Sequence, residues 1–399
     1  MLYRRVPRNG DELSALGFGC MRLPQKDGAI DEPRAVRQIR HAIDRGVNYV
    51  DTAWNYHGGE SERVLGRALA GGYREKVKLA TKLPAWLVKS PEDMDRFLNT
   101  QLEKLVTNHI DYYMVHSLNG AGWQAMDHLG VTGFLDRALR DGRIVNAGFS
   151  FHGAPEEFKP IADAYPWTFC LMQYNYMDEQ NQAGKAGLQY AASRGLAVMV
   201  MEPLLGGDLA RPSPPPAVAS IFSEARISRT PAAWALRWIW NHPEVTVVLS
   251  GMNEETHLEE NLATASQAYP DSLTAGELDL IRRAAEKYRE IRKVGCTSCG
   301  YCMPCPKGVE IAKCFEVYNN FHMFGQAPGM ARFLYVLNAG GVFSGAPGYA
   351  SQCEECKDCL EKCPQLLDIP SLLKQVAGEL EAEDLSKTEA MVRQMLMLG

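Results

Sequence analysis

The sequence predicts an α/β fold, in which a closed (β/α)8 barrel is followed by a small, mainly α-helical domain. Eight apolar runs recur along the first 265 or so residues, and each leads into a helix-like segment. The runs show little alternation of polar and apolar residues, as expected for parallel strands buried on both faces. Nine of the eleven cysteines crowd into residues 296–363, which predicts a second domain of different chemistry.

Eight strand–helix units of this total length match a TIM barrel in count and size. The expected strands are residues 15–23, 47–53, 77–83, 110–117, 144–150, 169–176, 196–204 and 245–252. The helices that follow them are expected at 34–45, 61–70, 91 onward, 123–141, 155–164, 182–194, 231–241 and 255–265. An open doubly wound sheet is the competing fold, but its glycine-rich first turn, GxGxxG, is missing.

Domain boundaries follow from the same pattern. We expect a barrel over residues 1–270, a connecting helix over 271–295, a cysteine-rich domain over 296–375 and a C-terminal helical tail over 376–399. Thr274 and Glu277 have the spacing of a capping box, which predicts the start of the connecting helix. That helix leads directly into Cys296 and is therefore expected to be a rigid connector.

Composition narrows the classes of partner and compartment. The net charge is −6 and no basic block is present, so no nucleic-acid partner is expected. No run reaches the roughly 18–20 apolar residues that a membrane helix needs, so no membrane association is expected. The first residues, MLYRRVPRNGDELS, lack the apolar stretch of an export signal, and we expect a cytoplasmic protein.

Four polar residues fall at the carboxyl ends of the first strands, where a (β/α)8 barrel carries its chemistry. They are Asp51, Tyr56 in the loop behind it, Lys82 and His116. An ammonium beside a phenol favours the phenolate and so helps a tyrosine to give up its proton, while a carboxylate can hold that ammonium in place. Each residue alone could also be a cap, a surface charge or loop packing.

The segment from Asp51 to Tyr56, followed by HGGESERVLGRAL, resembles the aldo-keto reductase family over residues 1 to about 270. The resemblance implies reduction of a small-molecule carbonyl substrate with hydride from NADP(H), with NAD(H) possible. Tyr56 would be the general acid, Lys82 its tuner, Asp51 the anchor of Lys82, and His116 the residue that orients the carbonyl.

The resemblance also implies a set of cofactor-binding residues. Ser150 and Gln173 would bind the nicotinamide carboxamide, although strand-end polar groups can also satisfy nearby backbone. The remaining expected positions are Met201 beside the nicotinamide, Pro203, Leu204 and Gly206 at the pyrophosphate, and Ser250, Gly251, Met252, Asn253, His257, Glu260 and Asn261 around the adenosine.

Three of these positions depart from the family pattern. Phe151 stands where many relatives have asparagine, and Met201 stands where a tyrosine often stacks on the nicotinamide. His257 stands where an arginine often grips the 2′-phosphate, and a neutral imidazole is a poorer phosphate clamp than a guanidinium. Preference for NADPH over NADH therefore stays open.

The crowded cysteines form two motifs. Cys353, Cys356, Cys359 and Cys363-Pro364 have the spacing of a ferredoxin 4Fe-4S site, whereas Cys296, Cys299, Cys302 and Cys305-Pro306 lack one residue before the last cysteine. Zinc is the alternative, but a zinc ribbon uses two CxxC pairs. By analogy with two-cluster ferredoxins, Cys363 would join the first three cysteines and Cys305 the second three.

The segment between the motifs contains two helix-like runs, at residues 311–324 and 330–339, so this part resembles the helical ferredoxin domains. Cys314 lies on the first run and is either packing or a reserve ligand for Cys305. Cys20 and Cys170 lie in apolar surroundings typical of buried thiols.

Three functions fit the two halves. The first is an NAD(P)H-dependent carbonyl reductase whose clusters are structural or redox-sensing. The second is an electron-transfer protein whose clusters link the barrel to a ferredoxin-like partner or a further cofactor. The third is a non-catalytic nucleotide-binding redox sensor, which the complete set of four strand-end residues disfavours. The sequence does not indicate the substrate; Trp54, Trp86 and Trp123 are candidate pocket walls or packing.

Overall fold

The computed structural model describes residues 1–342, 345–381 and 385–395. The chain folds into two compact units. The first comprises residues 1–204 and 229–278, and the second comprises residues 205–228 and 279–399. Each unit is described by itself.

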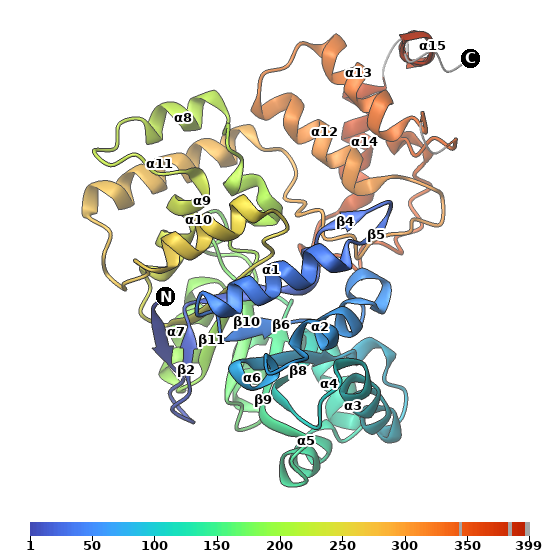
Figure 1. Cartoon of the computed structure of the whole chain (residues 1–399). Helices are drawn as coiled ribbons and strands as arrows, with labels where there is room; N and C mark the ends of the chain where they lie inside the picture. Colours follow the sequence, from blue (N-terminus) through green and yellow to red (C-terminus); the bar gives the residue numbers. More distant parts are fainter. Residues whose placement is uncertain (343–344, 382–384, 396–399) are drawn as a thin grey trace. The chain divides into compact units, whose positions relative to one another are not determined.

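Eight parallel strands close the first unit into a barrel, which confirms the predicted fold class (Figure 1). Around the barrel the strands run in the order β10, β11, β12, β3, β6, β7, β8, β9. They are β3 (Leu16–Gly19), β6 (Tyr49–Asp51), β7 (Lys78–Leu83), β8 (Ile110–Leu118), β9 (Ile144–Phe151), β10 (Phe169–Gln173), β11 (Ala197–Met201) and β12 (Val245–Ser250). Each lies within or one residue beyond a predicted strand.

Helices follow the strands as the (β/α) repeat requires. They are α1 (Glu32–Asp44), α2 (Ser61–Leu69), α3 (Pro91–Leu105), α4 (Gly120–His128), α5 (Val131–Arg140), α6 (Pro155–Asp163), α7 (Gly184–Ser193), α9 (Pro231–Trp240) and α10 (Glu255–Ala265). The expectation of one helix over 123–141 was wrong. The chain breaks there because Gly130, at φ 76°, takes the left-handed conformation that precedes α5.

An N-terminal hairpin, β1 (Tyr3–Arg5) with β2 (Glu12–Ser14), was not predicted. Val6 and Leu13 pack with Tyr49 and Phe169, which open strands β6 and β10. The hairpin therefore closes the amino-terminal end of the barrel, leaving the carboxyl ends of the strands for chemistry. A second short hairpin pairs β4 (Gln25–Lys26) with β5 (Ala29–Ile30).

The second unit is mainly helical. It contains α8 (Pro216–Phe222), α11 (Ala275–Ile291, from residue 279), α12 (Ile311–Met323), α13 (Pro328–Ala339), α14 (Ile369–Leu380) and α15 (Leu385–Met395). Helices α12, α13 and α14 lie together in this unit (Figure 1). They contribute Phe315, Tyr335 and Val376 to a core cluster of sixteen buried residues. Of the expected tail, residues 382–384 and 396–399 lie outside the described residues.

Residues 205–228 belong to a different unit from the one that the sequence predicts for them. Sequence reasoning assigns them to the barrel as the loop after β11, whereas in the structure they belong to the second unit. Two ion pairs join these residues to the rest of the second unit: Arg292 bonds to Asp208 at 2.9 Å and Arg283 bonds to Glu224 at 2.6 Å. Across the described ranges of the chain, no helix has the length and apolar content to cross a membrane.

Candidate functional site

A buried ion pair lies at the carboxyl ends of β6 and β7. The Lys82 ammonium donates to Asp51 Oδ1 at 2.6 Å and to the carbonyl oxygen of Thr52 at 2.7 Å. Both side chains are almost fully buried, at 1% and 3% exposure. Burial raises the pKa of Asp51, and the attraction of Lys82 opposes this rise. Because the pair is buried, water screens the positive charge of Lys82 little.

Tyr56 and His116 lie beside this pair. The Lys82 ammonium is 4.8 Å from the centroid of the Tyr56 ring, where a positive charge favours the phenolate form. The Tyr56 and His116 ring centroids are 6.3 Å apart in an edge-on arrangement. The structure thus brings together all four strand-end residues that the sequence singled out.

His116 is a neutral imidazole in this setting. Burial, and after it the positive charge of Lys82, lowers its pKa well below the usual value. Its Nδ1 is buried and has no hydrogen-bond partner among the described residues. A neutral ring carries one N–H donor, which can point at a substrate oxygen. Half-exposed Trp86 packs 5.1 Å from the same ring, centroid to centroid.

A buried polar network behind β7 holds the backbone of Lys82, and sequence reasoning missed it. Gln101, on α3, donates to the carbonyl oxygen of Lys82 at 2.9 Å and to Glu62 at 2.7 Å. Glu62 also accepts from Thr81 at 2.8 Å and from Lys104 at 3.2 Å. The sequence offered a signal, since Glu62 is a charged residue among the mostly apolar buried positions of α2.

The expected carboxamide residues lie at the ends of β9 and β10 and are buried. Ser150 Oγ accepts a hydrogen bond from the backbone N–H of Ser117 at 2.7 Å, which leaves its own hydroxyl proton available. The Gln173 amide nitrogen donates to Asp178 at 2.6 Å, and its oxygen accepts from Gln182 at 3.3 Å. Ser150 therefore satisfies a backbone N–H and still has a hydroxyl proton that it can donate.

His152 was not singled out from the sequence, yet its charge state affects His116. Its Nδ1 lies 3.2 Å from Gln182 Oε1, so that it joins the hydrogen-bond chain that reaches Gln173. Burial lowers the pKa of His152 to about 4, and Lys82 adds to the effect. Position 151, where the family pattern expects asparagine, is the fully buried Phe151, and the polar side chain follows one residue later.

The other residues expected around the cofactor differ in their burial. Ser250 and Asn261 are buried and bonded to each other at 2.9 Å, and Met252 is buried. His257 is exposed and contacts Asn253 through Nδ1 at 3.2 Å. Glu260 accepts from Thr230, while Gly251 and Leu204 are partly buried. Met201 packs against the core of the barrel, and Pro203 is buried.

Only one of the three candidate pocket tryptophans lies at the four-residue site. Trp54 packs edge-on to Phe97 at 4.8 Å and under the Lys104 ammonium at 3.8 Å. Trp123 packs against Trp167 at 5.9 Å. Trp86 is therefore the tryptophan placed to meet a substrate near His116.

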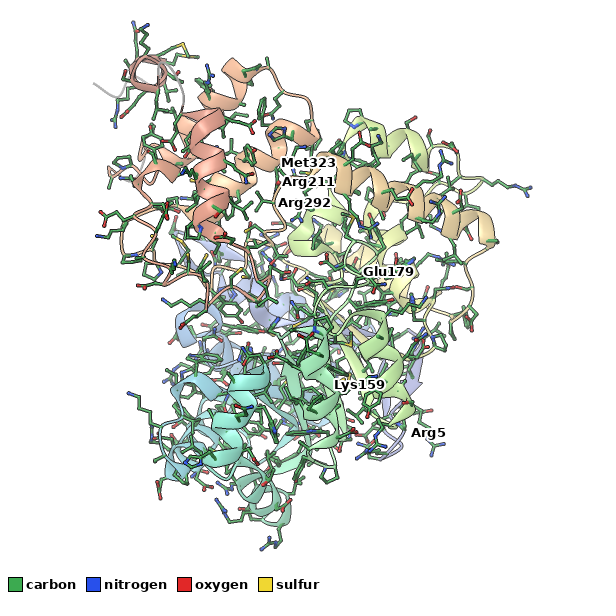
Figure 2. The ribbon with its side chains drawn as sticks, turned by 180° about the vertical axis from the view of Figure 1, so that it is seen from behind. Arg5, Lys159, Glu179, Arg211, Arg292 and Met323 are labelled. Atoms are coloured by element: carbon green, nitrogen blue, oxygen red, sulfur yellow. The ribbon has the colours of Figure 1, made fainter. Side chains whose placement is uncertain are left out.

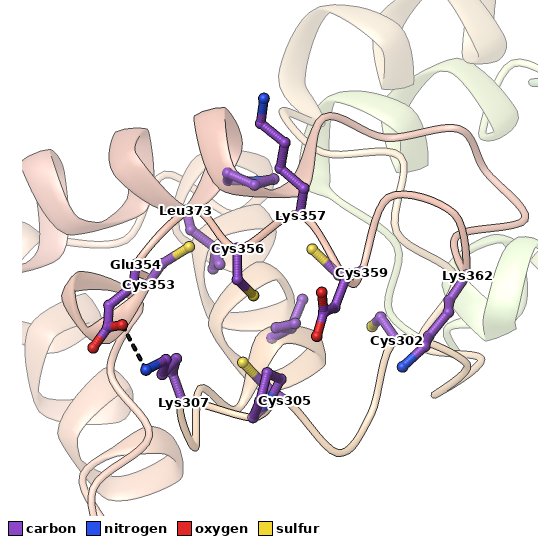
Figure 3. A pocket seen from close by; sticks show the side chains of 14 residues that line it. Cys302, Cys305, Lys307, Cys353, Glu354, Cys356, Lys357, Cys359, Lys362 and Leu373 are labelled. Carbon is purple, nitrogen blue, oxygen red and sulfur yellow. Dashed lines mark ion pairs between the residues drawn. The ribbon is translucent and has the colours of Figure 1, made fainter.

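The eight motif cysteines line two recesses in the second unit. One recess is lined by Cys296, Cys299, Cys302 and Cys363. The other, drawn in Figure 3, is lined by Cys305, Cys353, Cys356 and Cys359, with Cys302 at its edge. Each recess thus carries the four thiols of the expected crossed set, and thiolate sulfurs are the ligands that iron–sulfur clusters take.

The two motifs share one backbone turn. Ser298 and Glu355, directly before the second cysteine of each motif, have φ of 53° and 54°. Gly300 and Lys357, directly after that cysteine, have φ of 78° and 68°. The missing residue of the first motif therefore falls after this shared turn, between Cys302 and Cys305. Within the described ranges, no three His, Cys, Asp or Glu side chains are spaced for a single metal ion.

The cysteines outside the motifs are buried. Cys314 lies in the core of the second unit, with its sulfur 3.5 Å from the carbonyl oxygen of Gly348, and it lines neither recess. Burial raises its pKa to about 12. Cys20 and Cys170 are fully buried, and burial raises the pKa of both thiols.

Comparison with known proteins assigns the two parts of the chain to families. Residues 15–276 match the sequence profile of the aldo/keto reductase family. The chain belongs to the aldo/keto reductase family. Residues 295–368 match the 4Fe-4S dicluster domain, which the chain carries after its reductase barrel.

Individual relatives match about two thirds of the chain. L-galactose dehydrogenase of Arabidopsis thaliana is 25% identical over 66% of this chain and 88% of its own length. An aldo-keto reductase structure from Bacillus halodurans, in its holo form, is 25% identical, with a TM-score of 0.60 over 71% of this chain and 96% of its own. A Klebsiella pneumoniae aldo-keto reductase solved with NADPH is 21% identical, with a TM-score of 0.56 over 71% and 95%.

Proposed function

We propose that the chain is an NAD(P)H-dependent carbonyl reductase in which Tyr56 is the general acid. The supporting observation is the buried Lys82–Asp51 pair under the Tyr56 ring, next to an imidazole that burial keeps neutral. Ser150 and Gln173 would hold the nicotinamide, which would supply a hydride to the carbonyl carbon. NADPH is the expected cofactor, as in the Klebsiella pneumoniae enzyme, which was solved with it.

The residues of the chain divide the rest of the reaction among them. Tyr56 holds the proton that passes to the carbonyl oxygen, and the nearby Lys82 ammonium stabilises the phenolate that remains. Asp51 fixes Lys82 through a 2.6 Å bond, so no reorganisation is needed when charge develops. His116 donates a hydrogen bond to the same oxygen and orients it.

The second unit would hold two 4Fe-4S clusters. Cys296, Cys299, Cys302 and Cys363 would bind one, and Cys305, Cys353, Cys356 and Cys359 the other. The crossed lining of the two recesses and the shared turn of the two motifs support this assignment. The clusters would be structural or redox-sensing in this proposal.

The experiment compares Tyr56→Phe with Tyr73→Phe on the full chain, purified without oxygen. Tyr73 is a surface tyrosine bonded to Asp44 at 2.9 Å and is the matched control. Because a general acid contributes about 10²–10⁴-fold, Tyr56→Phe should lower kcat by at least roughly 100-fold for aliphatic and aromatic aldehydes. Nucleotide binding should be unchanged. Full aldehyde reductase activity in Tyr56→Phe would refute the proposal.

An electron-transfer function is the second candidate. Cys356 is exposed, so the second cluster would lie near the surface, where a ferredoxin-like partner could reach it. If NADPH added without oxygen bleaches the visible absorption of the clusters, this candidate gains. If the clusters stay oxidised even when a carbonyl substrate is present, direct wiring to the barrel is excluded.

A further inference from the structure

The turn that follows Leu204, Leu205–Ala210, lies directly against the first cysteine motif. Gly206 has φ +68°, and a Cβ atom built there would meet the carbonyl oxygen of Thr297 at 2.4 Å. Thr297 follows Cys296, so the backbone of this turn touches the backbone of a cluster loop. No other residue type fits at position 206 without moving one of the two backbones.

One side chain joins the same two segments. Arg292 Nε donates to Asp208 Oδ2 at 2.9 Å, and its Nη2 donates to the carbonyl oxygen of Cys296 at 2.7 Å. The guanidinium is 7% exposed and Asp208 is 16% exposed, so water screens the pair little. Arg211 bonds to the other Asp208 oxygen at 2.7 Å, and Figure 2 shows Arg211 and Arg292 close together.

A backbone hydrogen bond also reaches the Cys296 sulfur. The Ser298 backbone N–H donates to Cys296 Sγ at 3.4 Å, a type of bond that tunes cluster thiolates. Arg292 therefore holds the backbone of Cys296, an expected ligand of the first cluster, through a hydrogen bond.

We propose that Arg292 is a positioning residue that couples nucleotide binding to the redox state of the first cluster. The inference rests on the proposed function and on the position that the family resemblance implies for Gly206, at the cofactor pyrophosphate. Reduction of the first cluster by a one-electron donor, such as a ferredoxin-like protein or dithionite, would add one negative charge on the Cys296 side of Arg292. The added charge draws Arg292 away from Asp208, and the Asp208 carboxylate that loses its partner repels the phosphates. The reduced protein therefore binds nucleotide less tightly than the oxidised protein.

Coupling between two equilibria is reciprocal, so nucleotide binding must lower the reduction potential of that cluster. A tenfold loss of affinity on reduction corresponds to about 59 mV for a one-electron couple. Arg292 bonds to the backbone of Cys296, which belongs to the first cysteine set, so the potential of the second cluster should change less.

The test uses the full chain with both clusters, purified without oxygen. The probe is 2′-phospho-ADP-ribose, which carries the pyrophosphate but no nicotinamide and therefore exchanges no electrons with the clusters. Affinity is measured calorimetrically for oxidised and dithionite-reduced protein. The potentials are measured by mediated titration followed by electron paramagnetic resonance, with and without the probe.

For the unaltered chain we expect about tenfold weaker binding after reduction and a negative shift of one cluster's potential. Arg292→Gln should remove both effects while both clusters remain. Arg283→Gln, which removes an exposed ion pair to Glu224 in the same unit, should keep them. Asp208→Asn provides a second variant, which leaves the bond between Arg292 and Cys296 in place and should also uncouple the two sites.

Equal affinities in the two redox states of the unaltered chain would overturn the inference, as would coupling that survives in both Arg292→Gln and Asp208→Asn. These results differ from a failure of the proposed function, in which neither the probe nor NADPH binds in either redox state.

Discussion

Breaking the Lys82–Asp51 pair should destabilise the barrel far more than breaking an exposed pair. In Lys82→Met the Asp51 carboxylate stays buried without its cation, and Asp51 Oδ2 already has no partner among the described residues. The Thr52 carbonyl loses its donor as well. Removing one partner of a buried ion pair costs about 3–5 kcal/mol. Asp51→Asn combined with Lys82→Met should recover most of this loss, because no uncompensated charge remains.

The seven tryptophans, all within residues 54–240 and all in the first unit, make barrel unfolding measurable by fluorescence in urea. With an m-value of about 3 kcal/mol/M, a loss of about 4 kcal/mol moves the midpoint down by roughly 1.3 M. Lys76→Met is the control, since Lys76 pairs with Asp44 at 3.3 Å while both side chains are about half exposed. It should cost no more than about 1 kcal/mol, or roughly 0.3 M.

Equal midpoint shifts for Lys82→Met and Lys76→Met would refute the reasoning. The same holds if the double variant is less stable than Lys82→Met alone, because the cost would then not come from a stranded charge.

Three further predictions follow from other parts of the structure. Because the folded pKa of His152 is about 4, below its value of 6.5 in an unfolded chain, the unfolded state binds the extra proton. Stability is therefore lost as pH falls from about 6.5 to about 4, by about 3 kcal/mol in total, and His152→Gln should flatten this part of the urea-midpoint profile. Cys305→Ser should lower the iron content of anaerobically purified protein toward half, whereas Cys314→Ser should leave iron unchanged; the reverse pattern would make Cys314 the ligand. Gln101→Leu should cost about 1–3 kcal/mol in the same urea assay, because Glu62 and a backbone carbonyl each lose a buried donor.

Local patterns in the sequence predicted the barrel well. Each strand is buried on both faces, so apolar runs such as residues 77–83 and 245–252 stand out from the polar turns around them. The break at Gly130 was missed because a single glycine within a helical pattern does not by itself end a helix. Helix α8 was missed because prolines dominate residues 212–216, although proline is accepted at the first turn of a helix.

Part of the candidate site could likewise be predicted from the sequence, and part could not. Residues at strand ends, such as Asp51 and Lys82, could be found because the barrel topology assigns the carboxyl ends of strands to chemistry. The contacts of Arg292 with Asp208 and Cys296 could not, because they join segments 84 residues apart through one side chain. His152 was missed because the family pattern places a polar residue, often asparagine, at position 151. In this chain the polar side chain is His152, one residue later.

The crossed lining of the two cysteine recesses has a mechanical consequence for the C-terminal unit. Each recess takes one thiol from the other motif, so a cluster in either one ties together chain segments near residues 300 and 360. Such a tie restricts the unfolded chain as a disulfide does, and the restriction grows with the length of the closed loop. Helices α12 and α13 lie between the tied ends. Oxygen damage to one cluster would therefore leave the second tie in place, and only the loss of both clusters would release the loop-closure constraint on these helices.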